Sequence, residues 1–125
     1  MNVPKTEALK QCVDATVVEN ACYRGDYFHI TFEAPSISPH VMAGHFVHLQ
    51  LPEAANLVLR RPFSIFDTDP DAGTLSLIYK VVGAGSMALS QVGKGELIGL
   101  IGPCGKPFPL SSSDAPVVIV AGGYG

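Results

Sequence analysis

Hydrophobic and polar residues alternate in several short stretches of this 125-residue chain, which predicts β-strands. The clearest case is 27-YFHITFEA-34, where every second residue is apolar and the others are mostly polar. Strand-like sequence also fills residues 11–23, 45–52, 57–67, 74–82 and 96–102, with Gly or Pro turn signals between the segments. We expect 57–67 and 74–82 to form a hairpin across the turn 68-TDPDAG-73. Short strands at this spacing favour an antiparallel barrel or sandwich.

Two segments depart from this alternation. Residues 86–92 lie between Gly85 and Gly93 and lack a strand pattern, so we predict one short helix there. Residues 115–121 form a nearly continuous apolar run that ends in 122-GGYG-125. Such runs are typical of parallel strands covered on both faces, and a strand leading into glycines begins many nucleotide-binding α/β domains. We therefore expect a barrel domain at 1–110, followed at 111–125 by a linker and the first strand of a truncated second domain.

Composition narrows the function classes. Hydrophobic residues make up 47% of the chain and charged residues 15%, which favours a folded domain over disorder. The net charge is −3, and eight Lys and Arg residues spread along the chain disfavour a nucleic-acid binder. No apolar run approaches the roughly 20 residues that a membrane span needs. The N-terminal stretch lacks a signal-peptide core, so we expect a cytoplasmic protein.

Cysteine and histidine spacing gives no metal motif. The three cysteines (Cys12, Cys22 and Cys104) are odd in number and contain no CxxC, so we interpret them as reduced thiols in or near the core. The four histidines likewise lack the spacing of known zinc motifs. We therefore expect no metal site.

The stretch 60-RRPFS-64 combines groups suited to a ligand. A guanidinium recognises phosphate, and a serine hydroxyl can both donate to and accept from the edge of a heteroaromatic ring. Pro62 interrupts the strand ladder, which leaves neighbouring backbone groups open to a ligand. The alternative interpretation is an edge strand with two solvated arginines.

A second candidate lies in 78-IYKVVGAGSMALSQV-92. Here a strand ends at Gly83, and Gly85 and Ser86 begin the predicted helix, with Ser86 as the candidate N-cap. The N–H groups of a helix start favour an anion such as phosphate. A capped helix without a ligand is the alternative. The argument for a ligand rests on finding both features within about 30 residues.

Together these features resemble the FAD domain of the ferredoxin–NADP reductase superfamily. The segment Arg61–Ser64 is similar to the Arg-x-x-Ser/Thr strand of that family, Ile78–Lys80 to the next strand, and Gly85-Ser86 to the phosphate turn. The stretch 102-GPCGKPF-108 resembles the GPxGxxF loop of the family, and 117-VVIVAGGYG-125 resembles the opening strand and glycine turn of its NAD domain. The resemblance implies an all-β, six-stranded antiparallel Greek-key barrel with one short helix. It also implies FAD bound by Arg61, Pro62, Phe63, Ser64, Ile78, Tyr79, Lys80, Gly85 and Ser86.

Within the superfamily, LRRPFSI, IYKVVGAGS and IGPCGKPFPL are most similar to electron-transfer subunits of dihydroorotate dehydrogenase, a pyrimidine-biosynthesis enzyme. This implies an oxidoreductase that takes electrons from NAD(P)H through FAD and a [2Fe–2S] centre to a catalytic dehydrogenase subunit. Cys12, Cys22 and Cys104 do not match the cluster spacing of that subfamily, and a complete NAD domain is missing. We therefore expect a fragment that binds FAD but neither NAD(P)H nor the cluster.

The resemblance also implies a role for single residues. Arg61 would meet the pyrophosphate and Ser64 the isoalloxazine edge, although residues three apart lie on opposite faces of an ideal strand. The strand should therefore be distorted, with Pro62 as the cause. Arg60 is left as a solvated residue or a secondary phosphate contact.

Aromatic residues near the motif are candidates to pack on the flavin or the adenosine. These are Phe63, Tyr79 and Phe66, of which Phe63 and Phe66 point to opposite faces by alternation. No acid–base residue is expected to be catalytic. Two other functions stay open: a non-enzymatic flavin- or ligand-binding barrel, and an interaction module that pairs through its edge strand. The C-terminal strand is a separate candidate for self-association.

Overall fold

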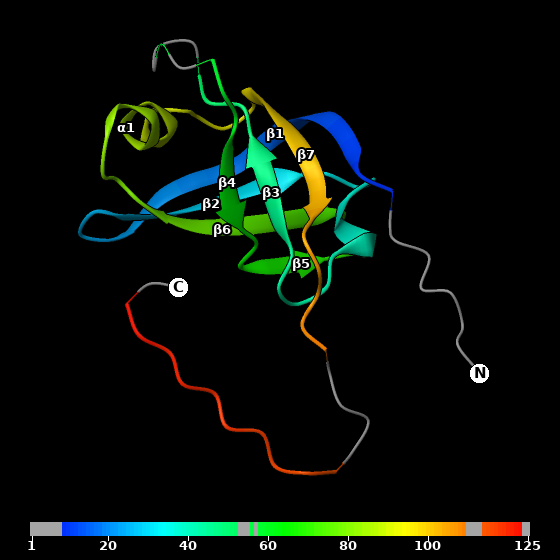
Figure 1. The fold of residues 1–125 in the computed structure, drawn as a ribbon. Helices are drawn as coiled ribbons and strands as arrows, with labels where there is room; N and C mark the ends of the chain where they lie inside the picture. Colours follow the sequence, from blue (N-terminus) through cyan, green and yellow to red (C-terminus); the bar gives the residue numbers. More distant parts are fainter. Residues whose placement is uncertain (1–8, 53–55, 57, 110–113, 124–125) are drawn as a thin grey trace.

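The computed structural model describes residues 9–52, 56, 58–109 and 114–123. These residues form a curled antiparallel sheet of seven strands with the order β4-β3-β7-β1-β2-β6-β5, together with one α-helix and one 3-10 helix (Figure 1). The elements are β1 (Gln11–Arg24), β2 (Tyr27–Glu33), η1 (Ser38–His40), β3 (Phe46–Leu49), β4 (Arg61–Ser64), β5 (Asp67–Asp69), β6 (Thr74–Lys80), α1 (Ala84–Ser90) and β7 (Leu97–Cys104).

The two edges of the sheet, β4 and β5, are joined directly by the chain. The N–H of Ile65 donates to the carbonyl of His45 on the β3 side at 3.3 Å, whereas the N–H of Phe66 donates to Ser76 in β6 at 2.8 Å. Two consecutive residues therefore bond to segments next to opposite edges of the sheet. This change of partner brings the edges together and gives the sheet its barrel form.

The predicted strand 57–67 is wrong in its extent and its pairing. It divides into β4, which pairs with β3, and β5, which pairs with β6. Only the short β5 forms the expected hairpin, because an extended stretch on a curled sheet cannot follow one partner along its whole length. This division explains why the described part of the chain has seven strands where six were expected. The fold class, an antiparallel barrel with one short α-helix, is confirmed.

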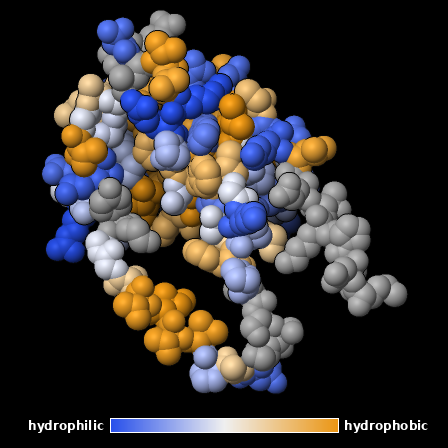
Figure 2. Space-filling view, viewed as in Figure 1, coloured by the Kyte–Doolittle hydropathy of each residue, from blue (hydrophilic) through white to orange (hydrophobic). Residues whose placement is uncertain are grey.

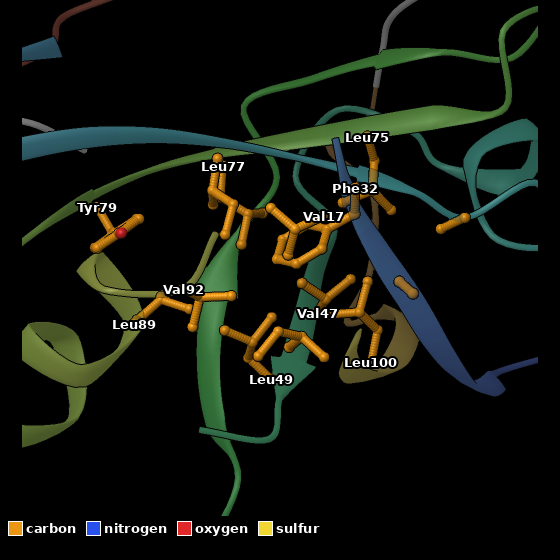
Figure 3. Packing of buried hydrophobic residues seen from close by; sticks show 14 of the residues in the cluster. Val17, Phe32, Val47, Leu49, Leu75, Leu77, Tyr79, Leu89, Val92 and Leu100 are labelled. Atoms are coloured by element: carbon orange, nitrogen blue, oxygen red, sulfur yellow. The ribbon is translucent and has the colours of Figure 1, made fainter. Parts of the chain in front are cut away.

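The core lies inside the curled sheet. The apolar face predicted for β2 is buried, with Ile30 and Phe32 fully enclosed. Side chains from other strands meet it, and Leu89 and Val92, from α1 and just beyond it, cover one end beside Tyr79 (Figure 3). Burial of each large apolar side chain contributes roughly 1.5–3 kcal/mol. The helix is thus held by its apolar face, although its sequence is too short to be stable alone.

The loop 102-GPCGKPF-108 fastens the end of β7 to the start of β3. A Cβ atom on Gly102 would lie 2.8 Å from Val47, and one on Gly105 would lie 2.8 Å from the ring of Phe46. The N–H of Phe108 then donates to the carbonyl of Ala43 at 2.9 Å. Glycine is needed at 102 and 105 because the two segments approach so closely.

Residues 115–121 carry no secondary structure in this chain. The side chains of Val117–Val120 are 81–92% exposed, and Figure 2 shows this apolar stretch extending away from the barrel. The division into domains at residue 110, and the interpretation of 115–121 as the first strand of a second domain, stay predictions. The predicted linker residues 111–113, the final residues 124–125 and residue 57 of the predicted strand lie outside the described residues.

The cysteines are only partly as predicted. Cys104 is buried, but Cys12 and Cys22 are exposed, because both lie on β1 positions that face outward or near its hairpin turn. Among the described residues, no cluster of three or more His, Cys, Asp and Glu side chains could hold a metal ion. The same part of the chain contains no helix long and apolar enough to cross a membrane.

Candidate functional site

A cleft of about 580 Å³ opens where β4, β6 and the first turn of α1 meet. This volume lies within the range of small-molecule and cofactor sites. All nine residues proposed from the sequence line the cleft, and the structure adds four. The lining consists of Leu51, Arg61, Pro62, Phe63, Ser64, Ile78, Tyr79, Lys80, Val82, Gly83, Ala84, Gly85 and Ser86.

The register of β4 explains how Arg61 and Ser64 both reach the cleft. Arg61 lies opposite Leu49, which is fully buried, so it is on the core side of the strand. Ser64 lies opposite Phe46 on the outer side. The two residues are on opposite faces, as their spacing predicts. They share the cleft because it runs along the free edge of β4, where side chains of both faces can reach it.

Backbone groups on that free edge are available as well. Because the N–H of Ile65 points to β3 and that of Phe66 to β6, alternation directs the N–H of Ser64 toward the cleft side. Pro62 falls at the other such position and has no N–H to leave unpaired. Proline therefore fits this edge strand, and Ser64 offers a backbone donor beside its hydroxyl.

The polar side chains of the β4 wall have no internal partner. Arg61 and Ser64 are exposed, and neither side chain makes a hydrogen bond or an ion pair with another described residue. Arg60 differs: its guanidinium donates to Gln50 Oε1 at 3.3 Å and covers Gly99, outside the cleft. Of the two adjacent arginines, only Arg61 faces the cleft.

The β6 wall is more deeply embedded. Tyr79 is 2% exposed, its ring stacks on Phe28 with a centroid distance of 5.7 Å, and its hydroxyl donates to Asn20 Oδ1 at 2.9 Å. Burial raises the pKa of Tyr79 to about 12. Tyr79 therefore stays neutral at physiological pH.

The two other aromatic candidates, Phe63 and Phe66, lie in different surroundings. Phe63 lines the cleft, half-buried, with its ring edge-on to Tyr79 at 6.2 Å. Phe66 does not line the cleft; it is 62% exposed and packs edge-on against His29. Phe66 therefore cannot share a ligand with Phe63 in this cleft.

The turn into α1 forms the third side. Gly83 is the N-cap, so the prediction of Ser86 as N-cap is wrong. The short helix predicted at 86–92 is present, but it spans Ala84–Ser90. Ser86 lies three residues on, where its hydroxyl accepts from the N–H groups of Val82 and Gly83 at 2.8 and 3.2 Å. The N–H groups of residues 84–86 have no partner within the helix, as at any helix start. They belong to residues that line the cleft.

The charge of the cleft is positive. Arg61 and Lys80 line it from two strands, and no Asp or Glu is among its described lining residues. This is notable in a chain of net charge −3. The Lys80 ammonium also lies over the Tyr27 ring, 5.6 Å from its centroid. The arrangement suits an anionic ligand with an aromatic part.

Four lining residues were not proposed from the sequence. Val82, Gly83 and Ala84 fill the gap between the two proposed stretches, so continuity along the chain was the signal that could have found them. Leu51 gives no such signal, since it reaches the cleft only through the pairing of β3 with β4.

Comparison with known proteins gives a consistent family. A model of the oxidoreductase FAD-binding domain matches residues 14–108. The chain is 33% identical over 117 residues to the electron transfer subunit of dihydroorotate dehydrogenase B (NAD(+)) from Desulforamulus reducens. That alignment covers 94% of this chain and 45% of the relative, so the chain spans less than half the relative's length.

Solved structures agree on the fold. The structure of an NADH-dependent reduced ferredoxin–NADP oxidoreductase superposes with a TM-score of 0.70 at 30% identity, covering 76% of this chain and 34% of that one. The Amycolatopsis cytochrome P450 reductase GcoB gives a TM-score of 0.65 at 23% identity, covering 80% of this chain and 30% of that one. At that lower identity the likeness concerns the fold alone.

Proposed function

Because this chain belongs to the family of oxidoreductase FAD-binding domains, we propose that the cleft between β4, β6 and α1 binds FAD. The observation that carries the proposal is the positive cleft whose β4 wall has an unpartnered arginine and serine. In this proposal Arg61 holds the pyrophosphate, and the Ser64 N–H and hydroxyl meet the polar edge of the isoalloxazine. Phe63 packs on the flavin ring, with Tyr79 behind it.

The remaining proposed residues complete the site. Pro62 keeps the free edge of β4 open, and Ile78 contributes apolar contact from β6. Lys80 supplies a second positive charge, and the N–H groups of Gly85 and Ser86 are free to donate to phosphate oxygens. With only seven residues in α1, this contribution rests on the N–H groups themselves more than on a helix dipole.

The residues present fit FAD in both of its parts. An apolar and aromatic floor suits a flavin ring, and two separate groups of donors suit a pyrophosphate. Bound flavin supplies the ability to accept a hydride and pass electrons on, chemistry that the side chains of this cleft lack. The protein's own part is placement: it orients the ring, holds the phosphates and shields one face from water.

We further propose that this chain is the flavin-binding part of an electron-transfer protein like its relatives, such as that of D. reducens. Such a protein would oxidise NADH, or NADPH, and pass electrons through FAD and a [2Fe–2S] centre to a catalytic dehydrogenase subunit. The support is the name of the relative, the electron transfer subunit of dihydroorotate dehydrogenase B (NAD(+)). The cytoplasmic location expected from the sequence stays a prediction.

Titration of the purified protein with FAD, FMN and riboflavin, followed by calorimetry, tests the cofactor. We expect FAD to bind more tightly than FMN, because a pyrophosphate can engage both Arg61 and the first turn of α1. Equal affinities for FAD and FMN would contradict the preference for FAD. No binding of any flavin would contradict the proposed function itself.

A second role, self-association through the C-terminal segment, has one specific observation in its favour. Val117–Val120 carry no charge and are 81–92% exposed, a profile that promotes β-pairing between chains. Light scattering of the chain with and without residues 111–125 tests it. Loss of mass beyond that of the removed residues supports association, and an unchanged oligomeric state argues against it.

A further inference from the structure

Asn20 is a polar residue on the interior side of β1. It lies opposite Ile30, which is fully buried, so both side chains point into the barrel. Its side-chain nitrogen donates to the carbonyls of Leu89 and Val92 at 2.8 and 2.9 Å. Its side-chain oxygen accepts from the Tyr79 hydroxyl at 2.9 Å. One amide thus joins three elements: β1, β6 and the C-terminal end of α1.

The chemistry of this position calls for an amide. The last carbonyls of a helix lack their regular backbone partners. The Leu89 carbonyl accepts from Asn20 as well as from the Val92 N–H at 3.1 Å, and the carbonyl of Val92, just beyond α1, accepts from Asn20. The Tyr79 hydroxyl, buried beside them, needs an acceptor. An amide supplies two N–H donors and a carbonyl acceptor, and the identity of its three partners fixes which end points where. A carboxylate of the same shape would offer acceptors only.

The network connects two sides of the cleft. Tyr79 lines the cleft from β6, and α1, which begins at Ala84, lines it through its first turn. The helix is seven residues long, roughly 10 Å, so its far end determines where its first turn lies. Asn20 does not line the cleft, yet it bonds to both elements that do.

We propose that Asn20 is a positioning residue of the cleft: it sets the distance between Tyr79 and the first turn of α1. In doing so it aligns the N–H groups of residues 84–86 with the phosphate part of the ligand. This inference rests on the proposed function, in which the cleft binds FAD. It predicts that loss of the network weakens contacts to phosphate and leaves contacts to the flavin ring intact.

The decisive variant is Asn20→Asp, which keeps the shape and removes both donors. At pH 8 we expect the affinity for FAD to fall about tenfold, the equivalent of two lost hydrogen bonds. The affinity for riboflavin, which has no phosphate, should change less than about twofold. Equal loss for both ligands, or no loss for either, would overturn the inference.

The pH dependence gives a readout that a merely structural role would not move. As the pH falls, the carboxyl group introduced by Asn20→Asp becomes protonated, and its O–H can donate to one of the two carbonyls. The ratio of wild-type to variant FAD affinity should therefore shrink between pH 8 and pH 5. A ratio that stays constant over this range contradicts the positioning role.

Two further variants keep the test valid if Asn20→Asp folds poorly. Tyr79→Phe removes only the bond to the Asn20 oxygen, and we expect a loss of FAD affinity of about threefold. Leu75→Ala, at the other end of β6, is the control for stability: it should lower the unfolding midpoint and leave both affinities unchanged. A loss of FAD affinity in Leu75→Ala equal to that in Asn20→Asp would show that stability alone is responsible.

Hydrogen exchange separates failure of this inference from failure of the proposed function. If the wild-type chain binds no flavin, FAD binding is refuted, but the network can still be tested in the free protein. The Met87 N–H donates to the Gly83 carbonyl, and the Val82 N–H donates to the Ser86 hydroxyl. We expect both to exchange at least about tenfold faster in Asn20→Asp than in Leu75→Ala of equal global stability. Equal exchange would overturn the inference.

Discussion

The β6 and β4 sides of the cleft contain similar polar groups in different surroundings. On the β6 side, which continues into α1, the Tyr79 hydroxyl bonds Asn20, and the Ser86 hydroxyl accepts from Val82 and Gly83. On the β4 side, Arg61 and Ser64 are exposed and have no side-chain partner among the described residues. The polar groups on the β6 side are therefore hydrogen-bonded within the barrel, whereas the side chains of Arg61 and Ser64 on the β4 side are available to a ligand.

This difference has a physical reason. β6 lies between two neighbours in the sheet, so its side chains are enclosed and must be satisfied internally. β4 is an edge strand, so its outer backbone groups and side chains can remain hydrated until a ligand replaces the water. Changes on the β6 side should therefore alter stability, and binding only through the position of α1, whereas changes on the β4 side should alter binding directly.

The largest effect is expected at Arg61, on the free wall. Arg61→Ala should lower FAD affinity by about one to two decades, because a hydrogen bond to a charged group contributes roughly 1.5–3 kcal/mol. Arg60→Ala is the matched control, since Arg60 lies outside the cleft against Gln50 and Gly99. It should change the affinity less than about threefold. Calorimetric titration of both variants measures the difference.

Comparable losses in the two arginine variants would remove the distinction between the walls. They would mean that long-range charge, not contact with Arg61, governs binding. Measuring the affinity for FAD at several salt concentrations distinguishes the two cases, because screening weakens the effect of a distant charge more than that of a direct contact. A large unfolding effect of Arg61→Ala would also contradict the comparison.

Tyr79, on the embedded wall, should affect stability through pH. Its pKa is about 12 in the folded chain and about 10 in the unfolded chain, so Tyr79 is protonated in both states below about pH 10. Between pH 10 and 12 the unfolded chain loses that proton first, so stability falls as the pH rises. The two-unit difference corresponds to roughly 2–3 kcal/mol.

Urea unfolding of the wild type and Tyr79→Phe at pH 9 and pH 11.5 measures this contribution. Other groups, such as lysines, titrate in the same range in both proteins, so the difference between the proteins isolates Tyr79. The wild type should lose more stability than the variant over this interval. Equal losses of stability in the two proteins would show that the Tyr79 hydroxyl is not buried.

The site residues were predictable where they were contiguous in sequence. Arg61–Ser64, Ile78–Lys80 and Gly85-Ser86 each form one short stretch, and the hairpin expected between the first two brought them to one place. The hairpin was nevertheless wrong in its extent, because only β5 pairs with β6 and β4, which carries Arg61–Ser64, does not. The curl of the sheet brings the two strands together instead, so correct proximity came from an incorrect ladder.

The remaining features depend on tertiary contacts that a single sequence does not contain. Nothing in the residues around Ile65 indicates that the chain changes partner there, because both halves are equally extended. Ser86 has the composition of an N-cap, but the helix begins earlier and turns it into an internal acceptor. Asn20 bonds Leu89, 69 residues away, and only the folded barrel brings them together.

A smaller effect is expected from Ser86→Ala on the embedded wall. The variant removes the acceptor for the N–H groups of Val82 and Gly83, so we expect a loss of about 1–2 kcal/mol in the free energy of unfolding. Ser90→Ala, in the same helix, is the control: its hydroxyl donates to the Met87 carbonyl and accepts from the Gln91 side chain, but it accepts from no backbone N–H group. That change should cost no more than about 0.5 kcal/mol. Equal losses in chemical denaturation would show that the Ser86 contacts are weak.

The smallest effect is expected from Ser64→Ala, which tests the comparison with a residue of the same type on the free wall. Ser64 has no side-chain partner among the described residues, so the free energy of unfolding should change by less than about 0.5 kcal/mol. Its hydroxyl should instead contribute roughly 0.5–1.5 kcal/mol to flavin binding, a loss of about two- to tenfold in affinity for FAD and riboflavin alike. Ser36→Ala, in an exposed loop outside the cleft, is the control for both measurements. If Ser64→Ala destabilises the fold as much as Ser86→Ala does, the β4 wall is structural too, and its polar groups are not held free for a ligand.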